Sequence, residues 1–171
     1  KRVGPHNVIC KLSELSEKYA IDTPVKAPLT FSADSFTQQG EDVLNFEIVY
    51  KTGYKPGFAF NPDDGLYYRF YEREQQLDGA NGEPLTCSNV IIMYVEYTYY
   101  DWDGSRPVAN LLNTKNLCTY FINGKCFNGY WRREGIDSAT QYFDASGNPV
   151  VFKPGTTYIQ ILREGKEVIM N

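Results

Sequence analysis

Histidine is almost absent from this 171-residue sequence, in which His6 is the single imidazole. Zinc sites commonly use four Cys or His ligands in closely spaced pairs, but the sequence contains no C-x-x-C pair among its four cysteines, Cys10, Cys87, Cys118 and Cys126. We therefore expect no metal site and no cofactor. A Ser-His-Asp or Cys-His catalytic site would have to use His6, and no G-x-S-x-G motif accompanies it. We assign no catalytic residue.

Long hydrophobic runs and basic clusters are also missing. No apolar run approaches the roughly 20 residues of a membrane-spanning helix. The formal net charge is −4, and the 17 Lys and Arg residues are scattered, with only Arg132 and Arg133 adjacent. Nucleic acids bind clustered basic side chains, so we expect no nucleic-acid partner. The sequence has no initiator Met and no signal-peptide pattern. We expect residues 1–171 to form one domain, the C-terminal part of a longer protein.

Tyrosine is abundant, with 14 residues in a chain that is 15% aromatic, as is typical of half-buried sheet faces. Residues 10–20 predict an amphipathic helix with Leu12, Leu15 and Tyr19 on one side. The rest of the chain alternates in the manner of short strands separated by tight turns. The predicted class is α+β, mainly β: an antiparallel sheet, sandwich or open barrel-like, with one N-terminal helix.

Two segments give more detailed predictions. The segment 89–102 is the longest strand candidate, and its early residues are apolar at odd and even positions alike. This pattern predicts a strand that is buried on both faces at one end only. Residues around Pro56-Gly57 predict a turn.

The stretch CTYFINGKCFNGYW (118–131) predicts a hairpin. Asn123-Gly124 favours a two-residue type I′ turn, which would pair Phe121 with Cys126 and place Cys118 opposite Gly129. Side chains alternate along a strand, so the two cysteines would project from opposite faces and could not form a disulfide. We interpret them as small buried apolar residues.

Two further patterns allow a binding role beside a structural one. DWDGS (101–105) resembles the start of a calcium loop, but it lacks the later ligands of an EF-hand and favours a polar turn. Several aromatic residues could form a sugar-stacking platform, although core packing is the favoured interpretation: Tyr94, Tyr100, Trp102, Tyr130 and Trp131.

A series of motifs occurs along the chain in a fixed order: RVGPHNV (2–8), YYRF (67–70), Asp78 with Asn81-Gly82, NVII (89–92), NGK…GYW (123–131), YFDASG (142–147) and KPGTTYIQI (153–161). In this order and spacing they resemble the C-terminal domain of the YerB-like family of bacterial lipoproteins, a domain of unknown function of the DUF3048 type. The resemblance covers nearly the whole chain, from Gly4 to Leu162. The cysteines are not part of the pattern.

The resemblance implies a domain outside the cytoplasm of mainly Gram-positive bacteria, held at the cytoplasmic membrane by a lipid anchor in the full-length protein. It implies no catalytic residue, cofactor or substrate. The positions it marks include the candidate binding residues His6, Asn7, Arg69, Asp78 and Trp131, besides Asn89, Lys125, Asp144 and Thr157.

From these observations we expect a non-catalytic binding or interaction module at the cell envelope. Its partners would be its own N-terminal domain and a cell-envelope protein or polysaccharide. Two alternatives stay open. One is an enzyme acting on cell-wall polymers, with His6, Arg69 and Asp78 meeting in a cleft. The other is a structural brace for the N-terminal domain.

Overall fold

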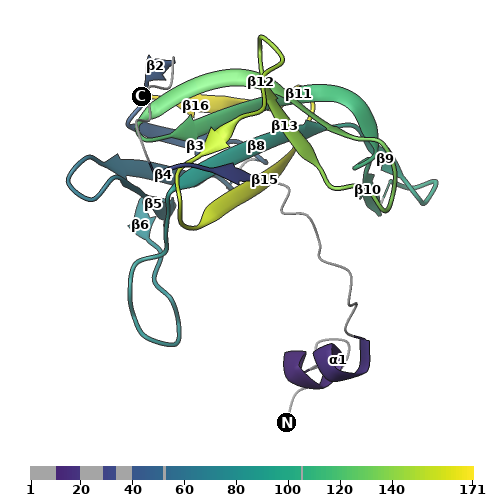
Figure 1. Ribbon diagram of the computed structural model, residues 1–171, viewed down its shortest axis with the longest axis horizontal. Helices are drawn as coiled ribbons and strands as arrows, with labels where there is room; N and C mark the ends of the chain where they lie inside the picture. The colour runs from purple at the N-terminus through teal and green to yellow at the C-terminus, as the bar shows by residue number, and fades with distance from the viewer. Residues whose placement is uncertain (1–10, 20–28, 34–39, 52, 105) are drawn as a thin grey trace.

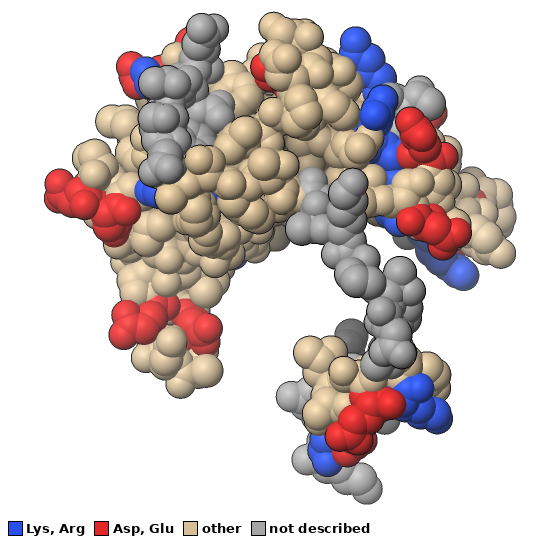
Figure 2. Space-filling view, viewed as in Figure 1, with Lys and Arg blue, Asp and Glu red and all other residues tan. Residues whose placement is uncertain are grey.

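The computed structural model describes residues 11–19, 29–33, 40–51, 53–104 and 106–171. His6, Asn7 and Cys10 lie outside these ranges. In the described part of the chain, the helix α1 (Leu12–Tyr19) precedes a long series of strands (Figure 1). This confirms the predicted α+β, mainly β class with an N-terminal helix. No residue of α1 is buried, and Figure 2 shows acidic and basic side chains together on its surface. No helix in these ranges is long and apolar enough to cross a membrane.

The first sheet has its strands in the order β13-β12-β11-β8-β15, and β2 also pairs with β12. Neighbouring strands are antiparallel except β8 and β15, which run parallel. The bounds are β2 (Glu41–Asp42), β8 (Asn89–Val95), β11 (Asn113–Ile122), β12 (Lys125–Arg133), β13 (Gln141–Asp144) and β15 (Thr157–Arg163).

The second sheet is antiparallel throughout, in the order β16-β3-β4-β5-β6, with β7 paired to β5. Two short pairs complete the structure, one parallel (β1 with β14) and one antiparallel (β9 with β10). The bounds are β3 (Asn45–Ile48), β4 (Pro56–Asn61), β5 (Leu66–Tyr71), β6 (Glu74–Gln75), β7 (Thr86–Cys87) and β16 (Val168–Met170), then β1 (Thr30–Phe31), β14 (Val151–Phe152), β9 (Tyr97–Tyr99) and β10 (Pro107–Ala109).

Apolar side chains fill both faces of the first sheet. The cluster between the two sheets includes Phe46 and Phe121, whose rings stack at 3.6 Å. A second cluster on the opposite face of the first sheet includes Ile91 and Trp131. Strand β8 is therefore buried on both faces, whereas the chain beyond it becomes exposed by Tyr99, as predicted. The predicted single strand 89–102 is divided at Glu96 into β8 and β9.

The hairpin of β11 and β12 has the predicted register. Asn123 and Gly124 have φ angles of 52° and 75°, as a type I′ turn requires. Phe121 pairs with Cys126, and Cys118 with Gly129. The two cysteines are free and lie in different apolar clusters, which confirms the interpretation as small buried residues. Burial, with a smaller contribution from the Glu41 carboxylate, raises the pKa of the Cys126 thiol to about 11.

The turn predicted around Pro56-Gly57 is wrong, because these residues begin β4. Proline is tolerated as the first residue of a strand, where its missing N–H need not contribute to the ladder. Phe58 then faces the core, while Gly57 and Ala59 fall on the opposite face of the second sheet. A surface pocket lies on this outer face.

Candidate functional site

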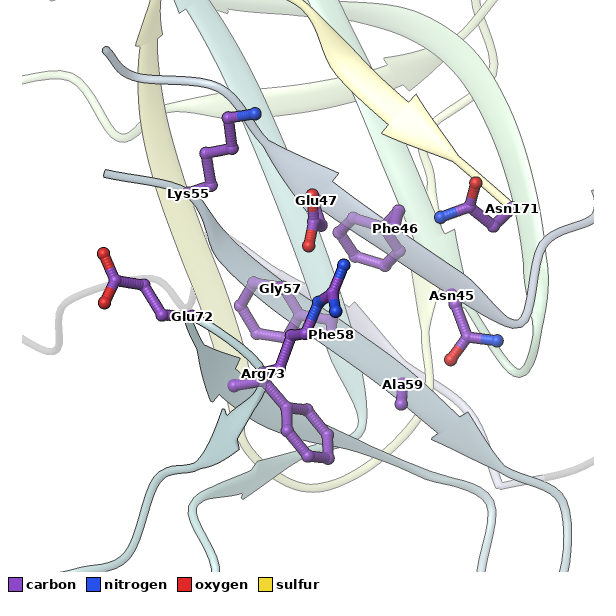
Figure 3. A pocket seen from close by; sticks show the side chains of 11 residues that line it. Asn45, Phe46, Glu47, Lys55, Gly57, Phe58, Ala59, Glu72, Arg73 and Asn171 are labelled. Atoms are coloured by element: carbon purple, nitrogen blue, oxygen red, sulfur yellow. The ribbon is translucent and has the colours of Figure 1, made fainter. Parts of the chain in front are cut away.

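A surface pocket of about 250 Å³ lies on the outer face of the second sheet (Figure 3). Alternation along β3 produces this face, because Phe46 and Ile48 are buried while Asn45 and Glu47 point outward. Gly57, Ala59 and Phe70 line the pocket from β4 and β5. The small residues of β4 leave the space that the pocket occupies.

Four ionic side chains of both signs line the same pocket: Glu47, Lys55, Glu72 and Arg73. Among the described residues, the ion pairs involve none of these four. Figure 3 shows the Arg73 side chain extending over the sheet toward Glu47. Two carboxylates and two cations thus lie around the apolar ring of Phe70, and the carboxylate of Glu72 also interacts with the Tyr71 hydroxyl.

The turn between β5 and β6 holds two of these charges in an unfavourable backbone conformation. Tyr71 pairs with Glu74, so Glu72 and Arg73 form a two-residue turn with φ angles of 49° and 70°. Such turns usually contain Asn-Gly because side chains crowd the backbone at positive φ. Backbone strain of this kind is concentrated at functional sites.

Gly57 lines the pocket without a side chain of its own. A Cβ atom built there would lie 3.6 Å from Glu47 Cγ and 3.9 Å from Phe70 Cβ, which are ordinary contact distances. Alanine at this position would therefore occupy the pocket without displacing its neighbours. Gly57→Ala is thus a suitable variant for testing the pocket.

Arg69, one of the predicted binding residues, lies on the other face of β5, toward the first sheet. Its guanidinium carbon is 5.2 Å from the centroid of the Tyr158 ring. The Arg69 Nε and the nearby Gln76 Oε1 are both buried without a hydrogen-bond partner in the described structure. Since solvent does not reach Nε, this arrangement supports a packing role for Arg69 between β5 and β15.

A group of tyrosines shares this space with Arg69. Burial raises the pKa of Tyr50 to about 12, neighbouring tyrosines add to the increase, and the positive charge of Arg69 opposes it. The Tyr50 hydroxyl donates a hydrogen bond of 2.6 Å to Gln160 Oε1 on β15. At neutral pH Tyr50 is therefore a neutral hydrogen-bond donor that connects the end of β3 to the first sheet.

Asp78 closes a turn rather than facing Arg69. Its carboxylate accepts a hydrogen bond of 2.7 Å from the backbone N–H of Ala80, and its backbone bonds to Glu83 and Gly82. No hydrogen bond or ion pair of the described residues joins Asp78 to Arg69. Because His6 lies outside those residues, the proposed meeting of His6, Arg69 and Asp78 stays a prediction, as does a role for Asn7.

Trp131 has no exposed surface, and its indole N–H donates a hydrogen bond of 3.0 Å to the Tyr94 carbonyl. The ring therefore has no face open to a ligand, which corrects its choice as a candidate binding residue and favours core packing. The other members of the suggested aromatic platform differ in their exposure to solvent. Tyr94 and Tyr130 are half-buried, whereas Tyr100 and Trp102 are 79% and 99% exposed.

Other positions marked by the resemblance form structural contacts. Asn89 is fully buried, donates to the Lys153 carbonyl and the Thr157 hydroxyl, and accepts from the Lys153 N–H. Lys125 forms an ion pair of 2.7 Å with Asp42. Apart from these positions, residues 101–104 of DWDGS form a polar turn, and the Asp101 carboxylate pairs with Arg106. Within the described ranges, no group of three or more His, Cys, Asp or Glu side chains could hold a metal ion.

The sequence does not indicate the pocket directly, because Pro56-Gly57, at the start of β4, favours a turn. A usable signal was present in PGFAF, where Phe58 and Phe60 alternate with the small residues Gly57 and Ala59. Small residues on one face of a strand leave room for another group to approach. The charged turn at Glu72-Arg73 had no comparable signal, since its positive φ angles come from the pairing of β5 with β6.

Comparison with known proteins supports the resemblance. The solved structure of the YerB protein from Bacillus subtilis is similar, with a TM-score of 0.72 and 19% sequence identity. The match covers 91% of this chain and 51% of that protein, so the chain spans about half the length of its relative. No match was found among curated proteins. The sequence model of the DUF3048 C-terminal domain, a domain of unknown function, matches residues 46–159, and the chain belongs to this family.

Proposed function

We propose that this chain is a non-catalytic binding module that acts at the bacterial cell envelope, outside the cytoplasm, and that the pocket on the second sheet is its binding site. The observation that carries the proposal is the set of four ionic side chains around an apolar ring, none of which forms an ion pair with another described residue. Ligand sites commonly combine apolar walls with a few polar groups that orient the ligand.

Both signs of charge around one small pocket favour a peptide as the ligand. The carboxylates of Glu47 and Glu72 can bind an ammonium group, while Lys55 and Arg73 can bind a carboxylate. Phe70 offers apolar surface to a side chain between them. We therefore expect an envelope partner that presents a peptide carrying both charges. A bare polysaccharide would leave these ionic groups unpaired.

The chemical arrangement favours binding over catalysis. The described residues that line the pocket include no His, Cys, Ser or Tyr, and its carboxylates belong to Glu47 on β3 and Glu72 in the β5–β6 turn. The enzyme alternative needs His6, Arg69 and Asp78 to meet in a cleft. Of the two that the structure describes, Arg69 packs against Tyr158 and Asp78 closes a turn.

Binding can be tested with soluble cell-wall fragments that carry peptides and with glycan strands from which the peptides have been removed. Amide NMR titration should show shifts that cluster at Glu47, Gly57 and Phe70 with the peptide-bearing fragments alone. Arg73→Ala should weaken binding about tenfold, the equivalent of one ionic contact of roughly 1.4 kcal/mol. Lys166→Ala is the control, because it removes an exposed cation that does not line the pocket.

Three outcomes would contradict the proposal. Equal binding of peptide-free glycan would refute peptide recognition, and equal loss of affinity in Arg73→Ala and Lys166→Ala would refute the pocket as the site. Release of new, shorter fragments during the titration would favour the enzyme acting on cell-wall polymers.

A further inference from the structure

Strand β15 is the edge of the first sheet. Its seven residues pair with β8 on one side, and no backbone bond joins its other side to any part of the chain that the structure describes. Figure 1 shows it as the broad terminal strand of that sheet. A row of unpaired N–H and C=O groups at a sheet edge is a template for another strand.

Two hydrogen bonds identify the backbone groups that face outward. Asn89 N–H donates to the Thr156 carbonyl, and Glu164 N–H donates to the Val95 carbonyl. In a parallel pair, alternate residues direct both of their backbone groups toward the partner strand. The even-numbered residues of β15 therefore bond to β8. The odd-numbered residues direct their N–H and C=O groups away from it: Thr157, Ile159, Ile161 and Arg163.

This edge lacks the features by which proteins prevent strands from pairing. It contains no proline, lysine or acidic residue, and its one charge, Arg163, is at the end. The other sheet edges are shorter, with four residues in β13, three in β16 and two in β6. The side chain of Ile159, in the middle of the edge, is 43% exposed. β15 is therefore the edge best suited to pairing.

We propose that β15 pairs with β15 of a second copy of this chain, antiparallel and about a two-fold axis at Gln160. This register places Ile159 opposite Ile161 and Thr157 opposite Arg163. The outward backbone groups of each copy then meet the outward groups of the other. Both isoleucines fall on the same face of the joined sheet, where apolar cross-strand pairs stabilise it.

The charges of the strand support a second copy as the occupant. In the proposed register Arg163 lies opposite the neutral Thr157, so no like charges oppose one another. A two-fold axis also forms each contact twice, which is the usual geometry of homodimers. A shift of the register by one residue would set outward groups against groups already bonded to β8. A shift by two residues would again set outward groups opposite one another but would pair fewer of the seven residues of β15, so the axis at Gln160 gives the longest overlap.

Sedimentation equilibrium of the whole 171-residue chain, from micromolar to millimolar concentration, tests the inference. We expect a monomer–dimer equilibrium. Ile159→Pro should lower dimer affinity by at least about tenfold, because proline removes an outward N–H without breaking the ladder to β8. Ile159→Thr is the matched control, since it keeps that N–H and should retain much of the dimer. A circular dichroism spectrum of each variant shows that it is folded.

If Ile159→Pro fails to fold, Ile159→Lys provides the second test. Lysine is a common protective residue on natural edge strands, and it should likewise shift the equilibrium to monomer. A wild-type chain that stays monomeric at the highest concentration would overturn the inference. So would a dimer whose affinity is the same in wild type and in the folded proline or lysine variant, because that dimer would use another surface.

Discussion

The turn Glu72-Arg73 should store conformational strain that a change of two residues can release. The same chain has a reference for this turn in Asn123-Gly124, whose φ angles of 52° and 75° nearly equal the 49° and 70° of Glu72 and Arg73. The double variant Glu72→Asn/Arg73→Gly places the same Asn-Gly sequence at the strained turn. Both side chains are exposed, so their removal should cost little packing.

The expected gain follows from the backbone. A residue with a side chain at positive φ costs about 1–2 kcal/mol, and glycine avoids this cost. Glycine in turn loses more entropy on folding, roughly 0.5–1 kcal/mol. Asparagine at positive φ costs a few tenths of a kcal/mol less than glutamate, by a rough estimate. The double variant should therefore be about 1 kcal/mol more stable, which corresponds to roughly 2–4 °C in Tm at this chain length.

Urea denaturation followed by tryptophan fluorescence measures the difference, because Trp131 is fully buried and reports unfolding. Arg73→Ala is the control, since it removes the charge but keeps a side chain at positive φ. Its free energy of unfolding should stay within about 0.5 kcal/mol of wild type. A double variant that is no more stable than Arg73→Ala would refute the strain. If the pocket binds a charged peptide, the stabler variant should also bind more weakly.

Three further predictions concern the core and one surface carboxylate. Asn89→Ala should destabilise the fold by roughly 3 kcal/mol in urea denaturation, because about 1 kcal/mol is lost for each of its buried hydrogen bonds; a loss below about 1 kcal/mol would contradict the importance of those bonds. Trp131→Ala should cost about 3–5 kcal/mol, whereas the 99% exposed Trp102 should change stability by less than about 0.5 kcal/mol on the same substitution. The hydrogen bond from Tyr68 holds the pKa of Asp64 below its usual 3.8, so its stabilising contribution is present above that pH and is lost as pH falls through the lowered value. The stability difference between wild type and Asp64→Asn should shrink in that acid range, and a constant difference would show that Asp64 does not titrate in this way.

Local patterns predicted local structure well. Asn123-Gly124 was sufficient to predict a turn type and, through it, the pairing in the β11–β12 hairpin as far as Cys118 and Gly129; between Asn113 and Asn116 an irregularity shifts the register. The apolar run at the start of 89–102 correctly indicated a strand covered on both faces. The prediction of a turn at Pro56-Gly57 failed because a local preference for turns was outweighed by the pairing of β4 with both β3 and β5.

The candidate sites could not be predicted in the same way. The pocket combines residues of β3, β4, the β5–β6 turn and the C-terminal Asn171, so no stretch of sequence contains it. The sequence favoured core packing for Trp131 but left a ligand platform open, and only its complete burial in the structure distinguishes the two. The exposed edge at β15 depends on which strand lies beside it, and a parallel pairing with β8 has no short turn to indicate it.

The sequence by itself determined the class of the fold, the helix, the principal hairpin and the separation of Cys118 from Cys126, because these depend on residues close together in the chain. Only the tertiary structure decided that β4 is a strand, that Trp131 is fully buried in the core and that Glu47 and Arg73 line one pocket. The physical reason is that pairing between strands distant in sequence sets which side chains are covered and which backbone groups remain unpaired. The surfaces proposed for binding, the pocket and the β15 edge, both follow from that pairing.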